Sequence, residues 1–170
     1  MKELLIIIAG PIFQFFAFYL LLFLIPSKKE LIRLYHYPIL CFNLLPIYPL
    51  DGGKLLCLFL EYFFPYKTSK KGMIKISYFV IVFLLFLGKK NINTIGILFF
   101  LALITYKESQ KIDTLYQKFL LERYLKNYTF PKRKIIFSED NFYRERKHLI
   151  KIGDNYVLEK NYLEKKYSSK

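Results

Sequence analysis

Residues 44–53 of the chain read LLPIYPLDGG, which sets one carboxylate, two prolines and two glycines inside an apolar segment. An ionisable side chain in a membrane span costs about 2.5 to 3.5 kcal/mol by insertion scales, so its first interpretation is a functional site. The prolines and glycines interrupt a helix, and unwound backbone at membrane depth is tolerated only where it is buried in protein or lines a polar cavity. The helix-breaking residues are Pro46, Pro49, Gly52 and Gly53. We therefore expect Asp51 to lie at the wall of a site.

The composition around this segment indicates an integral membrane protein. The 170 residues are 54% hydrophobic and include 18 Phe, 15 Tyr and no Trp. The first two thirds of the chain are too apolar for an ordinary soluble domain. The net charge of +14 could suggest nucleic acid. However, basic residues that flank membrane spans are expected from the positive-inside bias and from attraction to anionic lipid. We therefore expect membrane lipid as a partner and no nucleic acid.

Four apolar segments precede a charged tail. Leu4 to Ile25 has no charge over 22 residues, which matches the roughly 20 needed to cross a bilayer. The other segments are Pro38 to Phe64, Ile74 to Gly88 and Ile92 to Tyr106, the last two separated by a break at Lys89-Lys90. The predicted fold is an all-α membrane protein with about four transmembrane helices, one of them broken at Pro46 to Gly53, plus a small cytoplasmic α+β tail.

The tail divides into a helix and a short basic unit. Apolar residues from Ile112 to Leu125 recur at helical spacing, so we expect an amphipathic helix from about Lys107 to Asn127. Pro131 marks a boundary, after which residues 134–137, 148–152 and 155–158 are typical of strands, with a turn at Gly153-Asp154. The predicted domains are 1–106 (transmembrane core), 107–128 (cytoplasmic helix) and 129–170 (small basic tail).

The distribution of Lys and Arg predicts the orientation. Residues 107–170 hold 16 of the 27 basic residues, and four more follow the broken segment at Lys67, Lys70, Lys71 and Lys75. Both regions are expected in the cytoplasm. The prediction is a multi-pass protein of the bacterial cell membrane with a cytoplasmic C-terminal tail.

Several roles are open to Asp51 from the residues alone. It could be a metal ligand, a proton carrier, a helix N-cap before the apolar run from Leu55 to Phe64, or half of a charge pair with Lys54. Lys54 could instead extend its ammonium group to the membrane interface. Glu61 is expected at that interface too. Cys41 and Cys57 lie in apolar runs and are expected to be small buried residues.

The order of residues from Asn43 to Lys54 resembles the site-2 protease family of intramembrane zinc metalloproteases, whose third core span carries an Asn/Pro-rich motif ending in Leu-Asp-Gly. The resemblance implies that Asp51 is the carboxylate zinc ligand and that Asn43 helps hold substrate or water near the metal. The prolines and glycines of residues 46–53 belong to the motif.

Two further segments carry the resemblance. Ile6-Ile7-Ile8-Ala9-Gly10-Pro11 looks like the start of the preceding core span, where the family has an Ala-Gly-Pro turn. Phe119-Leu120-Leu121-Glu122-Arg123-Tyr124 looks like the cytoplasmic segment of one branch, the stage IV sporulation protein FB type. That branch cleaves a sigma-factor precursor at the membrane and carries a C-terminal CBS-type domain, so the tail is expected to be a CBS-type remnant or a substrate-docking surface.

The motif that would complete a zinc site is missing from the sequence. A catalytic zinc keeps about three protein ligands and a water, and the family takes two ligands and the general base from a His-Glu-x-x-His helix. The two histidines, His36 and His148, lack a neighbouring His at i+4. We expect His36 in a loop at the membrane surface and His148 exposed in the tail, with neither binding zinc.

The resulting expectation is the C-terminal part of a site-2-type protease that starts after the first core helix. It would hydrolyse a peptide bond in or near a membrane span of a protein substrate only when a complementary N-terminal polypeptide supplies the missing ligands. One alternative is a non-catalytic membrane protein of the same fold that binds a partner. The other is an unrelated transporter-like protein, since broken helices also build transport sites.

Overall fold

A computed structural model of the chain describes residues 2–88, 91–126, 128, 130 and 132–168. The chain divides into two compact units. We call residues 1–58 and 73–106 the helical unit, and residues 59–72 and 107–170 the mixed unit. Asp51 and the surrounding motif belong to the helical unit, so that unit holds the predicted site.

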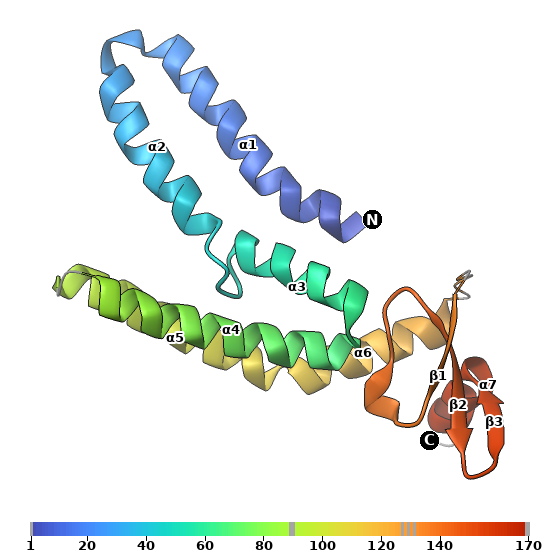
Figure 1. Cartoon of the computed structure of the whole chain (residues 1–170). Coiled ribbons are helices and arrows are strands. Elements are labelled where there is room, and N and C mark those ends of the chain that lie inside the picture. The colour runs from blue at the N-terminus through green and yellow to red at the C-terminus, as the bar shows by residue number, and fades with distance from the viewer. Residues whose placement is uncertain (1, 89–90, 127, 129, 131, 169–170) are drawn as a thin grey trace. The chain divides into compact units, whose positions relative to one another are not determined.

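The helical unit begins with a hairpin of two helices. Helix α1 (Lys2–Leu24) and helix α2 (Lys29–Asn43) run back along each other and are joined by the 3-10 turn η1 (Pro26–Lys28), as Figure 1 shows. Helix α1 is apolar along its length, and most of its large side chains are exposed, with Phe23 82% exposed. Such a surface suits contact with lipid. Phe18 is the exception, since it is buried.

The break in the second apolar segment is confirmed, but its start was predicted wrongly. Helix α2 already begins at Lys29 and continues through Pro38. A non-helical loop, residues 44–50, separates α2 from helix α3 (Asp51–Phe63). The Tyr48-Pro49 peptide bond in this loop is cis.

Two longer helices follow α3. Helix α4 spans Tyr66–Leu87 and helix α5 spans Ile92–Gln110, so both exceed the predicted 15 residues. The predicted break at Lys89-Lys90 lies outside the described residues. Among the described residues, two helices are long and apolar enough to cross a membrane, at Leu4–Leu24 and Ile92–Gln110. The four predicted spans are therefore not confirmed.

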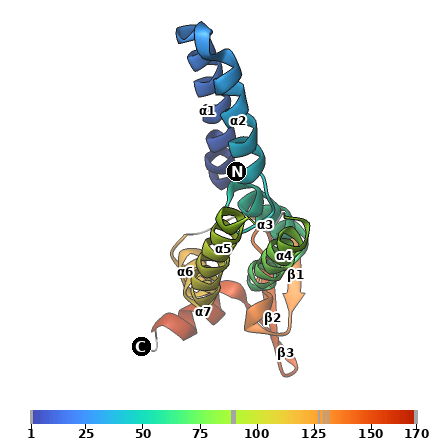
Figure 2. The same ribbon diagram turned by 90° about the vertical axis from the view of Figure 1, so that its left-hand side faces the viewer.

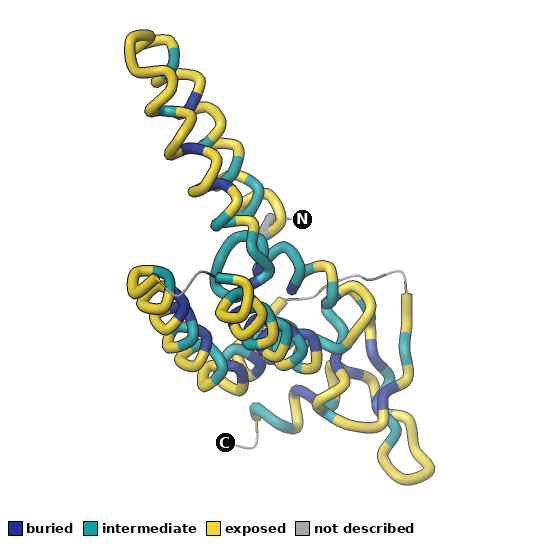
Figure 3. The backbone as a smooth tube through the Cα atoms, turned by 60° about the vertical axis from the view of Figure 1, so that its left-hand side comes forward, coloured by how far each residue is buried: buried dark blue, intermediate teal, exposed yellow. Residues whose placement is uncertain are grey.

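The interior of the helical unit is small and lies around the broken segment. Ile47 of the loop is fully buried and packs with Ile81 of α4 and with Leu98 and Leu101 of α5. In Figure 3 the tube is mostly yellow along α1 and α2 because these helices expose most of their side chains. Ile47 thus anchors the loop in an apolar cluster formed by α4 and α5.

The mixed unit combines helices with a three-stranded sheet. Helix α6 (Ile112–Leu125) is followed by strand β1 (Arg133–Ile136), the turn η2 (Glu139–Asn141), strand β2 (Lys147–Ile152), strand β3 (Asn155–Leu158) and helix α7 (Glu159–Ser168). The order is β1-β2-β3, with β1 parallel and β3 antiparallel to β2. The three predicted strands and the turn at Gly153 (φ 60°) are confirmed.

The helices of this unit were predicted less well. The predicted helix from Lys107 to Asn127 is wrong in its limits, because α5 extends to Gln110 and α6 begins at Ile112; Asn127 and Pro131 lie outside the described residues. Helix α7 was not predicted. It lies close to α6 in Figure 2, and Leu163 of α7 packs with Leu120 of α6 and Ile150 of β2.

Candidate functional site

Asp51 is the first residue of α3 and its carboxylate faces α1. A Cβ atom added at Gly10 of α1 would lie 2.9 Å from Oδ2 of Asp51, so the absence of a side chain at Gly10 leaves room for the carboxylate. The Asp51 side chain is 26% exposed. The motif with Asp51 and the earlier motif with Gly10 are far apart in sequence, and the structure brings them into contact.

The backbone of the loop comes so close to the first turn of α3 that only glycine fits at positions 52 and 53. A Cβ at Gly52 would collide with the carbonyl oxygen of Leu44, and one at Gly53 would collide with the carbonyl oxygen of Ile47. Glycine allows such an approach because it has no side chain. These two residues therefore let the loop fold tightly against the start of α3, directly beside Asp51.

Asn43 lies on the same side of α1 as Asp51. Its Nδ2 atom is 3.5 Å from Oε1 of Gln14, the outer limit for a hydrogen bond. Gln14 follows Gly10 by four residues on α1, and residues at that spacing share a helix face. One face of α1 thus carries Gly10 against Asp51 and Gln14 near Asn43. Gln14 was not predicted, although it is an amide within an otherwise apolar span.

The ammonium group of Lys54 forms an ion pair with the carboxylate of Asp51. Lys54 Nζ lies 3.3 Å from Oδ1 of Asp51, one turn along α3. The charge-pair alternative for Asp51 is therefore present in the structure. A metal ion bound at Asp51 would have to displace or share this contact, because Lys54 carries the same sign of charge as the metal.

The predicted zinc ligand, Asp51, does not belong to a group of three potential ligands in the described part of the chain. Over those residues, no three His, Cys, Asp or Glu side chains come together as a metal-binding group. The side chains present therefore do not fit a catalytic zinc ion, which keeps about three protein ligands.

Both histidine predictions are wrong about location. His36 lies within α2 and is only 8% exposed, because its ring stacks on Phe18 at 4.0 Å between centroids and meets Phe15 edge-on. His148 lies in β2 and is fully buried. The rings of Phe15 and Phe18 come from a different helix than His36, so the local polarity on which that prediction rested was misleading.

Two other predictions about burial were also partly wrong. Glu61, expected at the interface, is 2% exposed and pairs with Lys70 at 3.1 Å and with Arg144 at 2.5 Å. Cys57 is buried as predicted, whereas Cys41 is exposed. Glu61 and its partners belong to the mixed unit, so this carboxylate is used for local packing of that unit.

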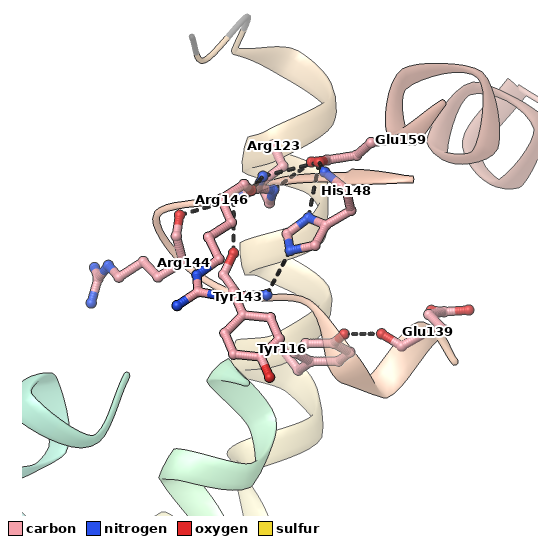
Figure 4. Close-up of polar contacts among 8 residues, drawn as sticks. All are labelled: Tyr116, Arg123, Glu139, Tyr143, Arg144, Arg146, His148 and Glu159. Carbon is pink, nitrogen blue, oxygen red and sulfur yellow. Dashed lines mark hydrogen bonds and ion pairs between the residues drawn. The ribbon is translucent and has the colours of Figure 1, made fainter. Parts of the chain in front are cut away.

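A buried polar network organises the mixed unit (Figure 4). Arg123 of α6 donates two hydrogen bonds to the carboxylate of Glu159, at 2.5 and 3.0 Å. Its remaining donors reach the carbonyl oxygens of Tyr143, Arg144 and Arg146 at 2.6 to 3.2 Å. The arginine thereby ties α6 to α7 and to the segment before β2, which the sequence did not predict.

His148 completes this network in its neutral form. The backbone N–H of Tyr143 donates to Nε2 at 3.0 Å, and Nδ1 lies 3.0 Å from Glu159, so Nδ1 carries the proton. Burial lowers the pKa of His148. Burial opposes ionisation of Glu159, but hydrogen bonds from His148 and Arg123 outweigh it and lower the pKa of Glu159 to about 2. The side chains of this network satisfy one another inside the protein, so we interpret it as structural.

Acidification is expected to unfold the mixed unit. Protonation of His148 favours the unfolded chain below its ordinary pKa of 6.5, and Glu159 contributes stability above pH 4.5 that is lost as the pH falls toward 2. The protection factors of amides in α6, β2 and α7 of the full chain, which correct exchange rates for their intrinsic pH dependence, should therefore fall steadily from pH 6.5 downward. In Glu159→Gln the unpaired Arg123 should destabilise the unit by about 3 to 5 kcal/mol at neutral pH. Lys126→Gln, which removes an exposed pair with Glu122, is the control and should change little. Equal protection in Glu159→Gln and the parent at pH 7 would contradict this account.

Comparison with known proteins gives one informative similarity. No protein-family model matches the chain. The chain is 35% identical over 133 residues to stage IV sporulation protein FB of Bacillus subtilis (strain 168), a match that covers 72% of this chain and 46% of that protein. The chain thus spans about half the length of the curated relative it matches. Together with the two apolar helices, this similarity indicates a membrane protein.

Proposed function

We propose that the chain is the Asp51-bearing part of an intramembrane protease of the site-2 family, in the branch of stage IV sporulation protein FB. The reaction would be hydrolysis of a peptide bond in or near a membrane span of a protein substrate. The sporulation branch suggests a membrane-associated sigma-factor precursor as that substrate. The similarity over 133 residues supports the family, and the residues of the loop support the site.

The observation that carries the proposal is the contact between two family-like motifs. Asp51 opens α3 directly after the unwound loop, and its carboxylate lies against Gly10, the glycine of the Ala-Gly-Pro segment. Glycines serve two neighbouring contacts around Asp51, one with α1 and one with the backbone of the loop. Here Gly10 leaves room for the carboxylate, while Gly52 and Gly53 leave room for the loop. The arrangement places the carboxylate of α3 directly beside α1, which supports a site between these two helices.

Zinc is the cofactor implied by the family, and Asp51 is the residue of this chain that would bind it. The described residues do not form a zinc site by themselves. We propose that the remaining ligands and the general base belong to a complementary N-terminal polypeptide carrying the His-Glu-x-x-His helix. No catalytic step is assigned to the chain alone.

A non-catalytic role for the same fold is the second candidate. The contact between Lys54 and Asp51 favours it, because an internal cation neutralises the carboxylate without a metal. In that case the protein would bind a membrane partner through the same surface. An unrelated transporter-like protein is the weaker alternative, because it would leave the 35% identity unexplained.

The role of the tail follows from the same family proposal. The tail, residues 129–170, would be a reduced CBS-type remnant or a docking surface for the substrate. Its small parallel and antiparallel sheet covered by α6 and α7 is compatible with either.

Reconstitution tests the proposed function. The purified chain alone should release no product from a membrane-spanning substrate, with or without added zinc. Co-expression with a polypeptide that carries the His-Glu-x-x-His helix should produce cleavage that a zinc chelator stops. Cleavage by the chain alone would contradict the proposal, and so would a complex that inserts and assembles but never cleaves. Substrate fragments on gels provide the measurement.

A further inference from the structure

The backbone of one loop residue before Asp51, Tyr48, is bound by side chains of two different helices. The backbone N–H of Tyr48 donates to Oγ of Ser77, on α4, at 2.8 Å. The carbonyl oxygen of Tyr48 accepts from Oγ1 of Thr105, on α5, also at 2.8 Å. Ser77 and Thr105 are both fully buried. All these residues belong to the helical unit.

These contacts go beyond the usual behaviour of hydroxyl groups in helices. A Ser or Thr inside a helix commonly donates to the carbonyl four residues earlier. Ser77 does so to Met73 at 2.9 Å, which leaves its lone pairs to accept from the Tyr48 N–H. Thr105 lies 2.8 Å from the carbonyl of Leu101 as well as from that of Tyr48, so its single proton serves both. The second partner of each hydroxyl is the same loop residue.

The loop needs such partners because it has left the helix. Peptide groups away from water must find hydrogen bonds inside the protein, and in a membrane no solvent replaces them. Tyr48 lies next to Ile47, which anchors the loop among Ile81, Leu98 and Leu101. The polar and apolar contacts therefore fix the same point of the loop to α4 and α5.

The fixed point lies close to the start of α3. The N–H of Leu50 donates to the carbonyl of Ile47 at 2.8 Å, and the N–H of Lys54 donates to that of Leu50 at 2.9 Å. This chain of backbone bonds continues from the anchored loop into the first turn of α3, where Asp51 lies. Displacement of Tyr48 would therefore move the carboxylate away from Gly10.

We propose that Ser77 and Thr105 are positioning residues that hold Asp51 in place through the backbone N–H and carbonyl of Tyr48. Their importance for catalysis rests on the proposed protease function, whereas their effect on the position of Asp51 does not. Neither hydroxyl is assigned contact with substrate or metal.

A disulfide cross-link measures the position of Asp51 without any activity. Gly10→Cys and Asp51→Cys are introduced together in the full chain, with Cys41 and Cys57 replaced by Ala. A Cβ at Gly10 would lie 3.7 Å from Cγ of Asp51, so the two thiols are close enough to form a disulfide on mild oxidation in membranes.

The cross-link is then compared between variants of the two hydroxyl residues. Thr105→Val removes the hydroxyl donor at nearly constant shape, and Thr105→Ser retains it. Ser77→Ala and Ser77→Thr form the matching pair on α4. Thr94→Val, on the same helix as Thr105, is the control.

The cross-link yield should fall at least twofold in Thr105→Val and in Ser77→Ala, while Thr105→Ser and Thr94→Val keep the parental yield. Rescue by Thr105→Ser distinguishes the hydroxyl from a general need for packing. Equal yields in all variants that insert into the membrane would overturn the positioning role, and so would a loss in Thr105→Ser as large as in Thr105→Val.

In the reconstituted complex, with Gly10, Asp51 and both cysteines intact, Thr105→Val should lower kcat at unchanged KM. A wild-type complex that does not cleave, with cross-links as expected, would overturn the proposed function and support the positioning.

Discussion

Asp51→Asn should abolish cleavage by the reconstituted complex and leave the chain in the membrane. Asn keeps the size of the side chain and remains a good residue at a helix start, so α3 should still begin at residue 51. It removes the charge that a metal ligand needs. Loss of one member of a catalytic unit typically lowers the rate by a factor on the order of 10⁴ or more, and we expect a loss of that size.

The neighbouring cation provides the matched control for this substitution. Lys54→Gln removes the partner 3.3 Å from Asp51 but leaves the carboxylate. That variant should cleave at least as well as the parent, because the metal no longer competes with an ammonium group. The measurement is initial cleavage rate at equal amounts of inserted protein. Unchanged cleavage in Asp51→Asn would exclude Asp51 as a ligand.

Gly52→Ala and Gly53→Ala should each destabilise the helical unit strongly. The added Cβ would meet backbone carbonyl oxygens of Leu44 or Ile47, and backbone cannot move aside as a flexible side chain can. Overpacking typically costs about 1 to 3 kcal/mol, and we expect the upper end of that range here. For a chain of this size the melting temperature should fall by roughly 6 to 12 °C.

Two other glycines show whether the effect is specific. A Cβ at Gly72 or Gly96 would meet nothing within 4 Å, and both lie inside helices, where Ala is favoured over Gly by about 1 kcal/mol. Gly72→Ala and Gly96→Ala should therefore be neutral or stabilising. Cys57 is 1% exposed, so its reaction with a maleimide during heating reports unfolding of the full chain when Cys41 is replaced by Ser. Equal melting of all four variants would contradict the packing described for the loop.

The features set by local chemistry could be predicted from the sequence. Prolines and glycines in residues 46–53 predicted the broken helix. Two short runs typical of strands, separated by the turn residues Gly153-Asp154, predicted β2 and β3. The length of α4 could not be predicted from apolarity alone, because its first half carries four lysines, at 67, 70, 71 and 75. A helix that is polar at one end does not stand out as an apolar segment.

Contacts between distant segments account for most of the errors. His36 looked like a surface residue among tyrosines, but Phe15 and Phe18 of α1 cover it. His148 lies in a basic segment, yet Glu159 and the Tyr143 backbone enclose it. Asp51 was identified from its motif, whereas the approach of Gly10 depends on how α1 packs and could only be seen in the structure.

The central claim is that Asp51 supplies one ligand of a zinc site whose other ligands lie on a second polypeptide. Zinc content of purified protein, measured by inductively coupled plasma mass spectrometry, tests it most directly. The chain alone should hold no zinc above the level of Asp51→Ala. The complex with the polypeptide carrying the His-Glu-x-x-His helix should hold one zinc per complex, and Asp51→Ala in the complex should lower that content. A complex that assembles without zinc, or one that holds the same zinc with Asp51→Ala, would contradict the claim.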